Sequence, residues 1–473
     1  MTPSAASSRP TPTTSAYNAG YVWTISLIAA LGGLLFGYDW VVIGGAKPFY
    51  ERFFDLTDPR AQGWAMSCAL IGALIGASVS GVATDRWGRK GLLLVSAALF
   101  AVSSLATGLA GTFGTFIAWR IIGGSAIGLA SSLSPMYIAE VAPAAVRGRL
   151  VSLNQLTIVC GILLAQIVNW LIARPVPAGA TAAEILHSWN GQVGWRWMFG
   201  VTAVPSLLFL VGTFFVPESP RWLMKSGRRE QAGRTLRRIN GDAGGQAALD
   251  EIEATLRDET ERVDWRALFS PKVRGALAFG IVLAVFQQWC GINVVFNYAE
   301  EVFSAAGYSV SDILLNIVIT GAVNLVFTFV AIGCVDRFGR RILMLVGAAG
   351  LAIIYTVLGL GYATHSHGVH MLLLVLAAIA CYSMSLAPVT WVLISETFPN
   401  RVRGLAMSVA VTFLWIACFI LTYTFPLLNR GLGAAGTFWI YAGVCAVGFV
   451  YLYFQLRETK GKTLEELEVR AEG

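Results

Sequence analysis

The sequence has few charged residues: only 13% of its 473 residues are Asp, Glu, Lys or Arg, against roughly 25% in an average soluble domain. Apolar residues make up 56% of the chain, and the mean hydropathy is +0.65. This shortage of charge excludes an ordinary water-soluble domain, because too few polar side chains remain to cover its surface. The composition is typical of a chain that lies in lipid.

Histidine and cysteine are also scarce, with four and seven residues. The cysteines fall within apolar runs and none has the spacing of a metal site, so we expect free thiols without disulfides. His365, His367 and His370 share one short segment, but no cysteine or carboxylate accompanies them, so we expect no metal there. The apolar runs contain no His, Cys or Ser set with catalytic spacing. We therefore predict that the protein is not an enzyme and has no cofactor.

Long apolar runs recur along nearly the whole chain. Each is close to the roughly 20 residues that a helix needs to cross a bilayer. They are too long and continuous for barrel strands, which alternate at every second residue, so they predict transmembrane helices. We count twelve runs, at residues 21–45, 61–83, 91–112, 114–138, 150–173, 194–216, 273–299, 311–334, 341–364, 370–395, 404–428 and 434–456. The predicted fold is an all-α membrane protein.

The distribution of Lys and Arg predicts the orientation of these helices. Twelve crossings put both termini on one side, and the tails and loops of that side hold 27 of the 34 basic residues. The other side holds six, and Arg120 lies inside the fourth run. Basic loops stay in the cytoplasm, so we expect a multi-pass protein of the cell (inner) membrane with both termini cytoplasmic. The net charge of +7 then reflects topology and does not indicate nucleic-acid binding.

Motifs that return once along the chain indicate an internal duplication. DRWGRK at 85–90 recurs as DRFGRR at 336–341, and the E-x-x-P-x-x-x-R-G spacing of 140–148 recurs at 396–404. Each copy follows the same run of its half, so we predict two six-helix bundles related as parallel repeats. The predicted divisions are a disordered cytoplasmic tail over 1–16, a first bundle over 17–217, a cytoplasmic helical linker over 218–270, a second bundle over 271–457 and a cytoplasmic tail over 458–473.

The repeated motifs place charges of both signs on the predicted cytoplasmic face. Opposite charges there could lock the two halves together while the inner side is closed. The alternative is that they are ordinary surface anchors, whose exposed pairs contribute little to stability. We favour a latch. Its predicted residues are Asp85, Arg86, Arg89, Glu140, Arg147, Glu218, Asp336, Arg337, Arg340, Glu396 and Arg403.

Asp39 stands near the middle of an otherwise apolar and glycine-rich stretch, GGLLFGYDWVVIGG. An ionised carboxylate at bilayer depth is costly unless it is partnered, hydrated or protonated. It could be a structural residue that hydrogen-bonds to another helix. It could instead exchange a proton, because burial favours the protonated form and a nearby guanidinium favours the ionised form. Arg120 is the one basic residue well inside a predicted helix, so we favour proton exchange at Asp39 with Arg120 as its partner.

Amide and aromatic side chains inside the predicted helices indicate a binding site for a polar solute. Amides both donate and accept hydrogen bonds, which suits neighbouring hydroxyl groups, and aromatic rings suit the C–H face of a sugar. The amides of FQQWCGINVVFN spread over about 220° of an ideal helix, so we predict a break near Gly291. The candidate site residues are Phe36, Gln155, Gln287, Gln288, Asn293, Asn297, Asn324, Trp391 and Trp415.

Together, GGLLFGYD, RIIGG, the two D-R-x-G-R motifs, PESPRWL, FQQ-x-x-GIN and RETKGKT resemble the sugar porter family of the major facilitator superfamily. The likeness covers about residues 21–468, and the pattern is most similar to that of bacterial xylose-proton symporters. The resemblance implies a monomer that imports a monosaccharide, pentose or hexose, together with protons. It also implies sugar-binding roles for the amides and tryptophans above. Passive family members typically have asparagine where this sequence has Asp39.

Some positions depart from the family pattern. Leu414 replaces a polar residue, Asn297 replaces a tyrosine, Ala387 replaces a glycine and Arg457 replaces a proline. A site that loses one amide binds a given hydroxyl less well, so these departures leave the sugar or polyol open. An uncoupled sugar or polyol facilitator and a sugar sensor that does not transport remain as alternatives.

Overall fold

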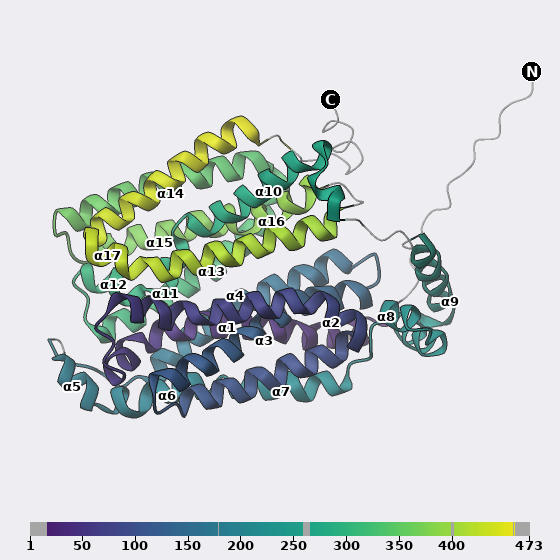
Figure 1. The fold of residues 1–473 in the computed structure, drawn as a ribbon, viewed down its shortest axis with the longest axis horizontal. Coiled ribbons are helices and arrows are strands. Elements are labelled where there is room, and N and C mark those ends of the chain that lie inside the picture. The colour runs from purple at the N-terminus through teal and green to yellow at the C-terminus, as the bar shows by residue number, and fades with distance from the viewer. Residues whose placement is uncertain (1–16, 178, 259–264, 399–401, 457, 459–473) are drawn as a thin grey trace, which may run out of the picture.

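The computed structural model describes residues 17–177, 179–258, 265–398, 402–456 and 458. These residues form two packed layers of long helices, joined by a connection that carries two further helices (Figure 1). The predicted all-α fold is thereby confirmed. The first half contains α1 (Ala19–Phe53), α2 (Pro59–Gly108), α3 (Phe113–Val141), α4 (Arg147–Ile172), α5 (Ala182–His187), η1 (Asn190–Gly194), α6 (Trp195–Gly200) and α7 (Ala203–Phe215).

The connection contains α8 (Pro220–Lys225) and α9 (Arg229–Asp258), which pack on each other through Trp222, Leu236 and Leu249. We call the end of the molecule at which α8 and α9 lie the linker end, and the other the far end (Figure 1). The second half contains η2 (Trp265–Phe269), α10 (Pro271–Trp289), α11 (Ile292–Asn297), α12 (Ala299–Ala305), α13 (Val310–Phe338), α14 (Arg340–Ala363), α15 (Val369–Met384), α16 (Leu386–Thr397) and α17 (Arg403–Gln455).

Within the described residues, ten apolar helical segments are long enough to cross a membrane. Two of them turn back at a glycine, namely α2 at Gly88 (φ 80°) and α17 at Gly433 (φ 69°). Glycine adopts these positive φ values without the clash that a Cβ would cause. Counted with these turns, the segments make twelve crossings, six in each half.

The predicted break in the seventh run is confirmed. Helix α10 ends at Trp289, Gly291 has the left-handed φ of 87°, and α11 begins at Ile292. The chain after the break is a separate helix, so the directions of its amide side chains do not follow from the helical periodicity of α10. The break also brings α11 against α1, which belongs to the other half.

Close helix packing within the first half depends on glycines. Gly72 and Gly76 on α2 face the backbone of Ile121 and Ser125, and Gly124 and Gly128 on α3 face the backbone of α2 in return. Helices in lipid gain little from burying apolar surface against each other, so close backbone contact through small residues supplies much of their attraction. This seam makes α2 and α3 one rigid unit.

The two halves contact each other at the far end. A Cβ added at Gly44 of α1 would lie 2.8 Å from the backbone oxygen of Phe296 in α11. A Cβ added at Gly63 of α2 would lie still closer to the backbone oxygen of Tyr423 in α17, and the backbone N–H of Val176 donates to Ser311 Oγ at 2.9 Å. The far end is therefore closed in this structure by backbone contacts that leave no room for larger side chains.

The glycine seam yields a stability prediction. Gly124→Leu should lower the thermal unfolding midpoint of the purified protein, because even a Cβ there would overlap the Ala69 carbonyl oxygen. Overpacking of this kind costs about 1–3 kcal/mol. Gly81→Leu on α2 is the matched control, since no atom lies within 4 Å of an added Cβ. Equal midpoints for the two variants would contradict the seam.

Candidate functional site

Asp39 and Arg120 form a buried ion pair. The Arg120 Nη1 donates to both carboxylate oxygens of Asp39, at 3.0 and 2.9 Å. Asp39 is 4% exposed and Arg120 is 3% exposed. The structure thus brings together α1 and α3 through the two charged groups that the sequence placed deepest in the apolar runs.

The surroundings of Arg120 make this pairing important. Its guanidinium carbon lies 5.4 Å from the centre of the Phe199 ring, and its Nε is buried without a hydrogen-bond partner. A buried cation without a carboxylate partner costs several kcal/mol. The Asp39 carboxylate is therefore the group that balances the buried charge of Arg120.

A row of hydrogen-bonded polar groups follows the break in the seventh crossing. Gln287 Nε2 donates to Tyr382 Oη at 2.9 Å, and Gln288 Nε2 donates to Gln287 Oε1 at 2.7 Å. Asn293 Nδ2 then donates to Gln288 Oε1 and approaches Cys418 Sγ at 3.7 Å. The helix break therefore places the amide of α11 beside the two amides of α10. This amide row can exchange its internal bonds for bonds to a polyhydroxy ligand.

The other predicted amides have different settings. Asn324 Oδ1 accepts a bond of 2.6 Å from Ser383 Oγ, which links α13 to α15. Asn297 is 4% exposed, and its Oδ1 has no hydrogen-bond partner. Gln155 on α4 is exposed. Only Gln287, Gln288 and Asn293 are thus joined directly to one another.

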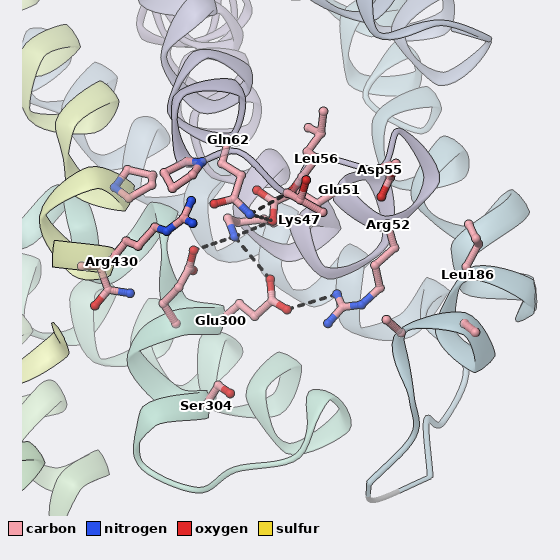
Figure 2. Close-up of a pocket in the computed structure, with 17 residues that line it drawn as sticks. Lys47, Glu51, Arg52, Asp55, Leu56, Gln62, Leu186, Glu300, Ser304 and Arg430 are labelled. Atoms are coloured by element: carbon pink, nitrogen blue, oxygen red, sulfur yellow. Dashed lines mark hydrogen bonds and ion pairs between the residues drawn. The ribbon is translucent and has the colours of Figure 1, made fainter.

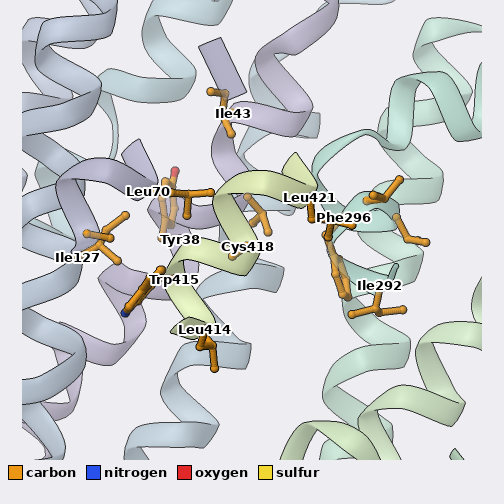
Figure 3. Close-up of a cluster of buried hydrophobic side chains, with 14 of the residues drawn as sticks. Tyr38, Ile43, Leu70, Ile127, Ile292, Phe296, Leu414, Trp415, Cys418 and Leu421 are labelled. Atoms are coloured by element: carbon orange, nitrogen blue, oxygen red, sulfur yellow. The ribbon is translucent and has the colours of Figure 1, made fainter. Parts of the chain in front are cut away.

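Aromatic rings of the two halves meet near the amide row. The centre of the Trp415 ring lies 6.0 Å from that of Phe36 and 6.1 Å from that of Trp40, both on α1. Trp40 directly follows Asp39 in the chain, and Trp415 is one turn from Cys418 on α17, which Asn293 contacts (Figure 3). The rings of α1 and α17 therefore meet between the halves, and the amide row reaches α17 through Cys418. Trp391 is 37% exposed.

Three residues of this region, Trp40, Tyr382 and Ser383, were not predicted from the sequence. Trp40 could have been found because it lies four residues after Phe36, on the same side of a helix. Tyr382 and Ser383 carry no such signal, since they meet Gln287 and Asn324 only through the fold. Leu414, which departs from the family pattern, is 5% exposed and leaves an apolar side chain beside Trp415.

The charged motifs of the first half bind one another at the linker end. Arg89 Nη2 lies 2.8 Å from Glu140 Oε1, and Glu218 accepts from the backbone N–H of Arg89 at 2.9 Å. Asp85 pairs with Lys225 of α8 at 2.9 Å. These contacts tie α2, α3 and α8 together within the first half. Arg86 and Arg147 are exposed.

The second half repeats part of this arrangement. Arg340 Nη2 lies 3.7 Å from Glu396 Oε1, and Glu458 accepts from the backbone N–H of Arg340 at 3.0 Å. The Arg403 guanidinium donates to the backbone oxygen of Phe398 at 3.2 and 3.3 Å. Arg337 is exposed, and the side chain of Asp336 lies outside the described residues. Each of the pairs described here joins helices of one half.

Comparison with known proteins shows similarity over nearly the whole chain. The D-xylose-proton symporter of Escherichia coli (strain K12) is 41% identical over 483 aligned residues, which cover 96% of each protein. The arabinose-proton symporter of Bacillus subtilis (strain 168) is 38% identical, with 97% of this chain and 96% of that protein covered. An inward open structure of the E. coli xylose transporter matches with a TM-score of 0.83 and 39% identity, over 95% of this chain and 100% of that one.

The family profile described as "Sugar (and other) transporter" matches residues 25–471. The match spans both halves and the connection between them, and it agrees with the twelve crossings, the paired motifs and the resemblance seen in the sequence. The protein is thus a membrane transporter with the major facilitator fold and not an enzyme. The chain belongs to the sugar transporter family.

Proposed function

We propose that this protein is a proton-coupled symporter that imports a monosaccharide, pentose or hexose, by alternating access. The observation that supports it most directly is the buried Asp39–Arg120 pair, because Asp39 shares α1 with Phe36 and Trp40, whose rings meet Trp415 of the other half. Symporters named for xylose and arabinose are among the similar proteins. Proton coupling needs an acid that lies beside the sugar site and changes its contacts when it is protonated.

The proposed proton step takes place at the Asp39 carboxylate. The ionised carboxylate holds Arg120 through the two hydrogen bonds to Nη1. A proton that binds to a carboxylate oxygen cancels its charge, weakens both bonds and releases α1 from α3. When the proton leaves, the ion pair forms again. Since α1 also carries Phe36 and Trp40, its position sets the shape of the adjoining sugar site.

The amide row and the rings would bind the sugar. When the site is empty, Gln287, Gln288 and Asn293 bond to one another, so no amide is left without a partner. When the sugar binds, its ring hydroxyls replace these bonds. Trp415, with Phe36 and Trp40, offers apolar ring faces to the C–H surface of the sugar. Gln155, Asn297, Asn324 and Trp391 are proposed to complete the site as it closes.

We further propose that the linker end faces the cytoplasm, that both termini lie there and that the transporter is a monomer in the inner membrane. Contacts at the far end and the similarity to an inward open structure support an inward-facing state. The motif charges would then form a latch between the halves only in the outward-facing state. Leu414 and Asn297 are proposed to set which sugar is preferred.

Replacing the proposed proton carrier separates coupling from transport. Asp39→Asn should abolish uphill accumulation, so that the sugar inside proteoliposomes only reaches the outside concentration under an imposed pH gradient. Counterflow between equilibrated compartments should persist, because exchange needs no net proton movement. Both are measured with a radiolabelled sugar, chosen by thermal-shift screening of aldopentoses, aldohexoses and cyclic polyols. Accumulation equal to that of the unaltered protein would refute the role of Asp39.

Removing the central amide tests the sugar site. Gln288→Ala should weaken sugar binding by about 5-fold to 100-fold, because losing a bond from a buried group costs about 1–3 kcal/mol. Isothermal titration of the purified protein gives the dissociation constant. Gln246→Ala is the control, since Gln246 bonds only to Asp250 on the exposed surface of α9. An unchanged constant for Gln288→Ala would remove that residue from the site.

A further inference from the structure

A second buried cluster of charges lies at the far end. Lys47 of α1 is only 2% exposed, and its Nζ lies 3.0 Å from Glu51 Oε2 on the same helix. The same nitrogen lies 2.6 Å from Glu301 Oε1 and 3.5 Å from Glu300 Oε2, both on α12 (Figure 2). One ammonium group therefore joins the first half to the second. We call Lys47, Glu51, Arg52, Glu300 and Glu301 the far-end charge cluster.

Arg52 strengthens this link between the halves. Its Nη1 lies 3.2 Å from Glu300 Oε1, so Glu300 is held by two cations of α1 (Figure 2). Gln62 Nε2 donates to Glu51 Oε2 at 3.3 Å and brings α2 into the same group. The cluster adjoins the close approach of Gly44 to Phe296, so its ion pairs form where the backbones of the two halves meet.

The cluster has one negative charge too many. Three carboxylates face two cations within it, and Asp55 and Arg430, which line the same pocket on opposite sides of the cluster (Figure 2), add one charge of each sign. Glu51 is 8% exposed, and its Oε1 is buried without a hydrogen-bond partner. Although 22% of the Glu301 side chain is exposed, its Oε2 is likewise covered and without a partner. An ionised oxygen in such a place is costly, whereas a protonated carboxyl group is neutral.

The surroundings favour the neutral form. Desolvation by the surrounding protein raises the pKa of Glu301, and the nearby Glu300 carboxylate adds to that effect while Lys47 opposes it. A pocket of about 650 Å³ borders the cluster and reaches the exposed residues Asp55 and Thr57, so water can approach. The titratable and charged groups that face Glu51 and Glu301 are Lys47, Tyr50, Arg52, Asp55, Tyr298, Glu300 and Arg430.

We propose that the far-end charge cluster is a second proton site, separate from Asp39, in which Glu51 and Glu301 share one proton while the far end is closed. When the halves part, α12 moves away from α1, the carboxylates become hydrated and the proton leaves. It binds from and returns to the same side of the membrane, so the ratio of protons to sugar is unchanged. The site makes closure of the far end depend on the outside pH. This inference rests on the alternating access of the proposed function.

The sign of the effect follows from linkage. The closed form binds the proton more tightly than the open form, so closure is favoured as the pH falls and is lost as the pH rises. One linked proton changes the ratio of closed to open molecules by up to about tenfold per pH unit.

Distance measurements between the halves test this proposal without any sugar. Spin labels on cysteines introduced at Thr57 and Ser304, both exposed, report the separation of the halves at the far end. The native cysteines are replaced, and the protein is held in lipid nanodiscs between pH 5 and 9. The Asp39→Asn background removes any contribution from that carboxyl group, so failure of the proposed coupling at Asp39 does not affect the result. We expect the fraction of molecules with the short distance between the two labels to rise as the pH falls.

Variants of Glu51, Glu301 and Asp55 test which carboxyl groups bind the proton. The double variant Glu51→Gln, Glu301→Gln should keep the short distance at every pH, because neutral amides need no proton. If the double variant does not fold, Glu51→Gln alone is used, and the midpoint of far-end closure should shift to higher pH. Asp55→Asn is the matched control, because its exposed carboxylate lines the pocket but forms no ion pair with the cluster among the described residues, and the variant should retain the slope. A slope that survives in the double variant, or the absence of any slope in the parent protein, would overturn the proposal.

Discussion

In the proposed mechanism, the buried contact between Asp39 and Arg120 is the interaction on which the transporter depends. Each charge is acceptable inside the bilayer only because the other lies within 3 Å. We propose that a proton on Asp39 weakens this pair and so frees α1 to move. Because α1 also carries Phe36 and Trp40, that movement would change the proposed sugar site.

In the proposed mechanism, the two halves move relative to each other as units. The glycine seam packs α2 closely against α3, and the motif charges at the linker end tie α8 to α2. The amide row belongs to the second half and the rings of Phe36 and Trp40 to the first, so a relative movement changes the distance between them. Lys47 lies eight residues after Asp39, about 12 Å along the same helix. Helix α1 thus carries both the proposed proton carrier and the Lys47 and Arg52 side chains that pair with α12 at the far end.

Much of this architecture could be predicted from the sequence. The twelve crossings follow from apolar length, the two halves from repeated motifs, and the break at Gly291 from amides that no single helix face could hold. Arg120 was identifiable as the partner of Asp39 because it is the one basic group deep in an apolar run. The bonds from Tyr382 to Gln287 and from Ser383 to Asn324 could not be predicted, because they depend on how separate helices approach. The apolar run predicts a helix that ends at residue 45, but α1 extends to Phe53, so the sequence did not predict a buried position for Lys47.

The most direct test of the central claim measures proton and sugar movement together in proteoliposomes that contain the unaltered protein. Sugar is added to lightly buffered vesicles without an imposed gradient, and the external pH is followed while sugar uptake is counted. Coupling through a protonated carboxyl group predicts that the medium becomes alkaline in fixed proportion to the sugar taken up, at every sugar concentration. Sugar uptake without any change in external pH would contradict it.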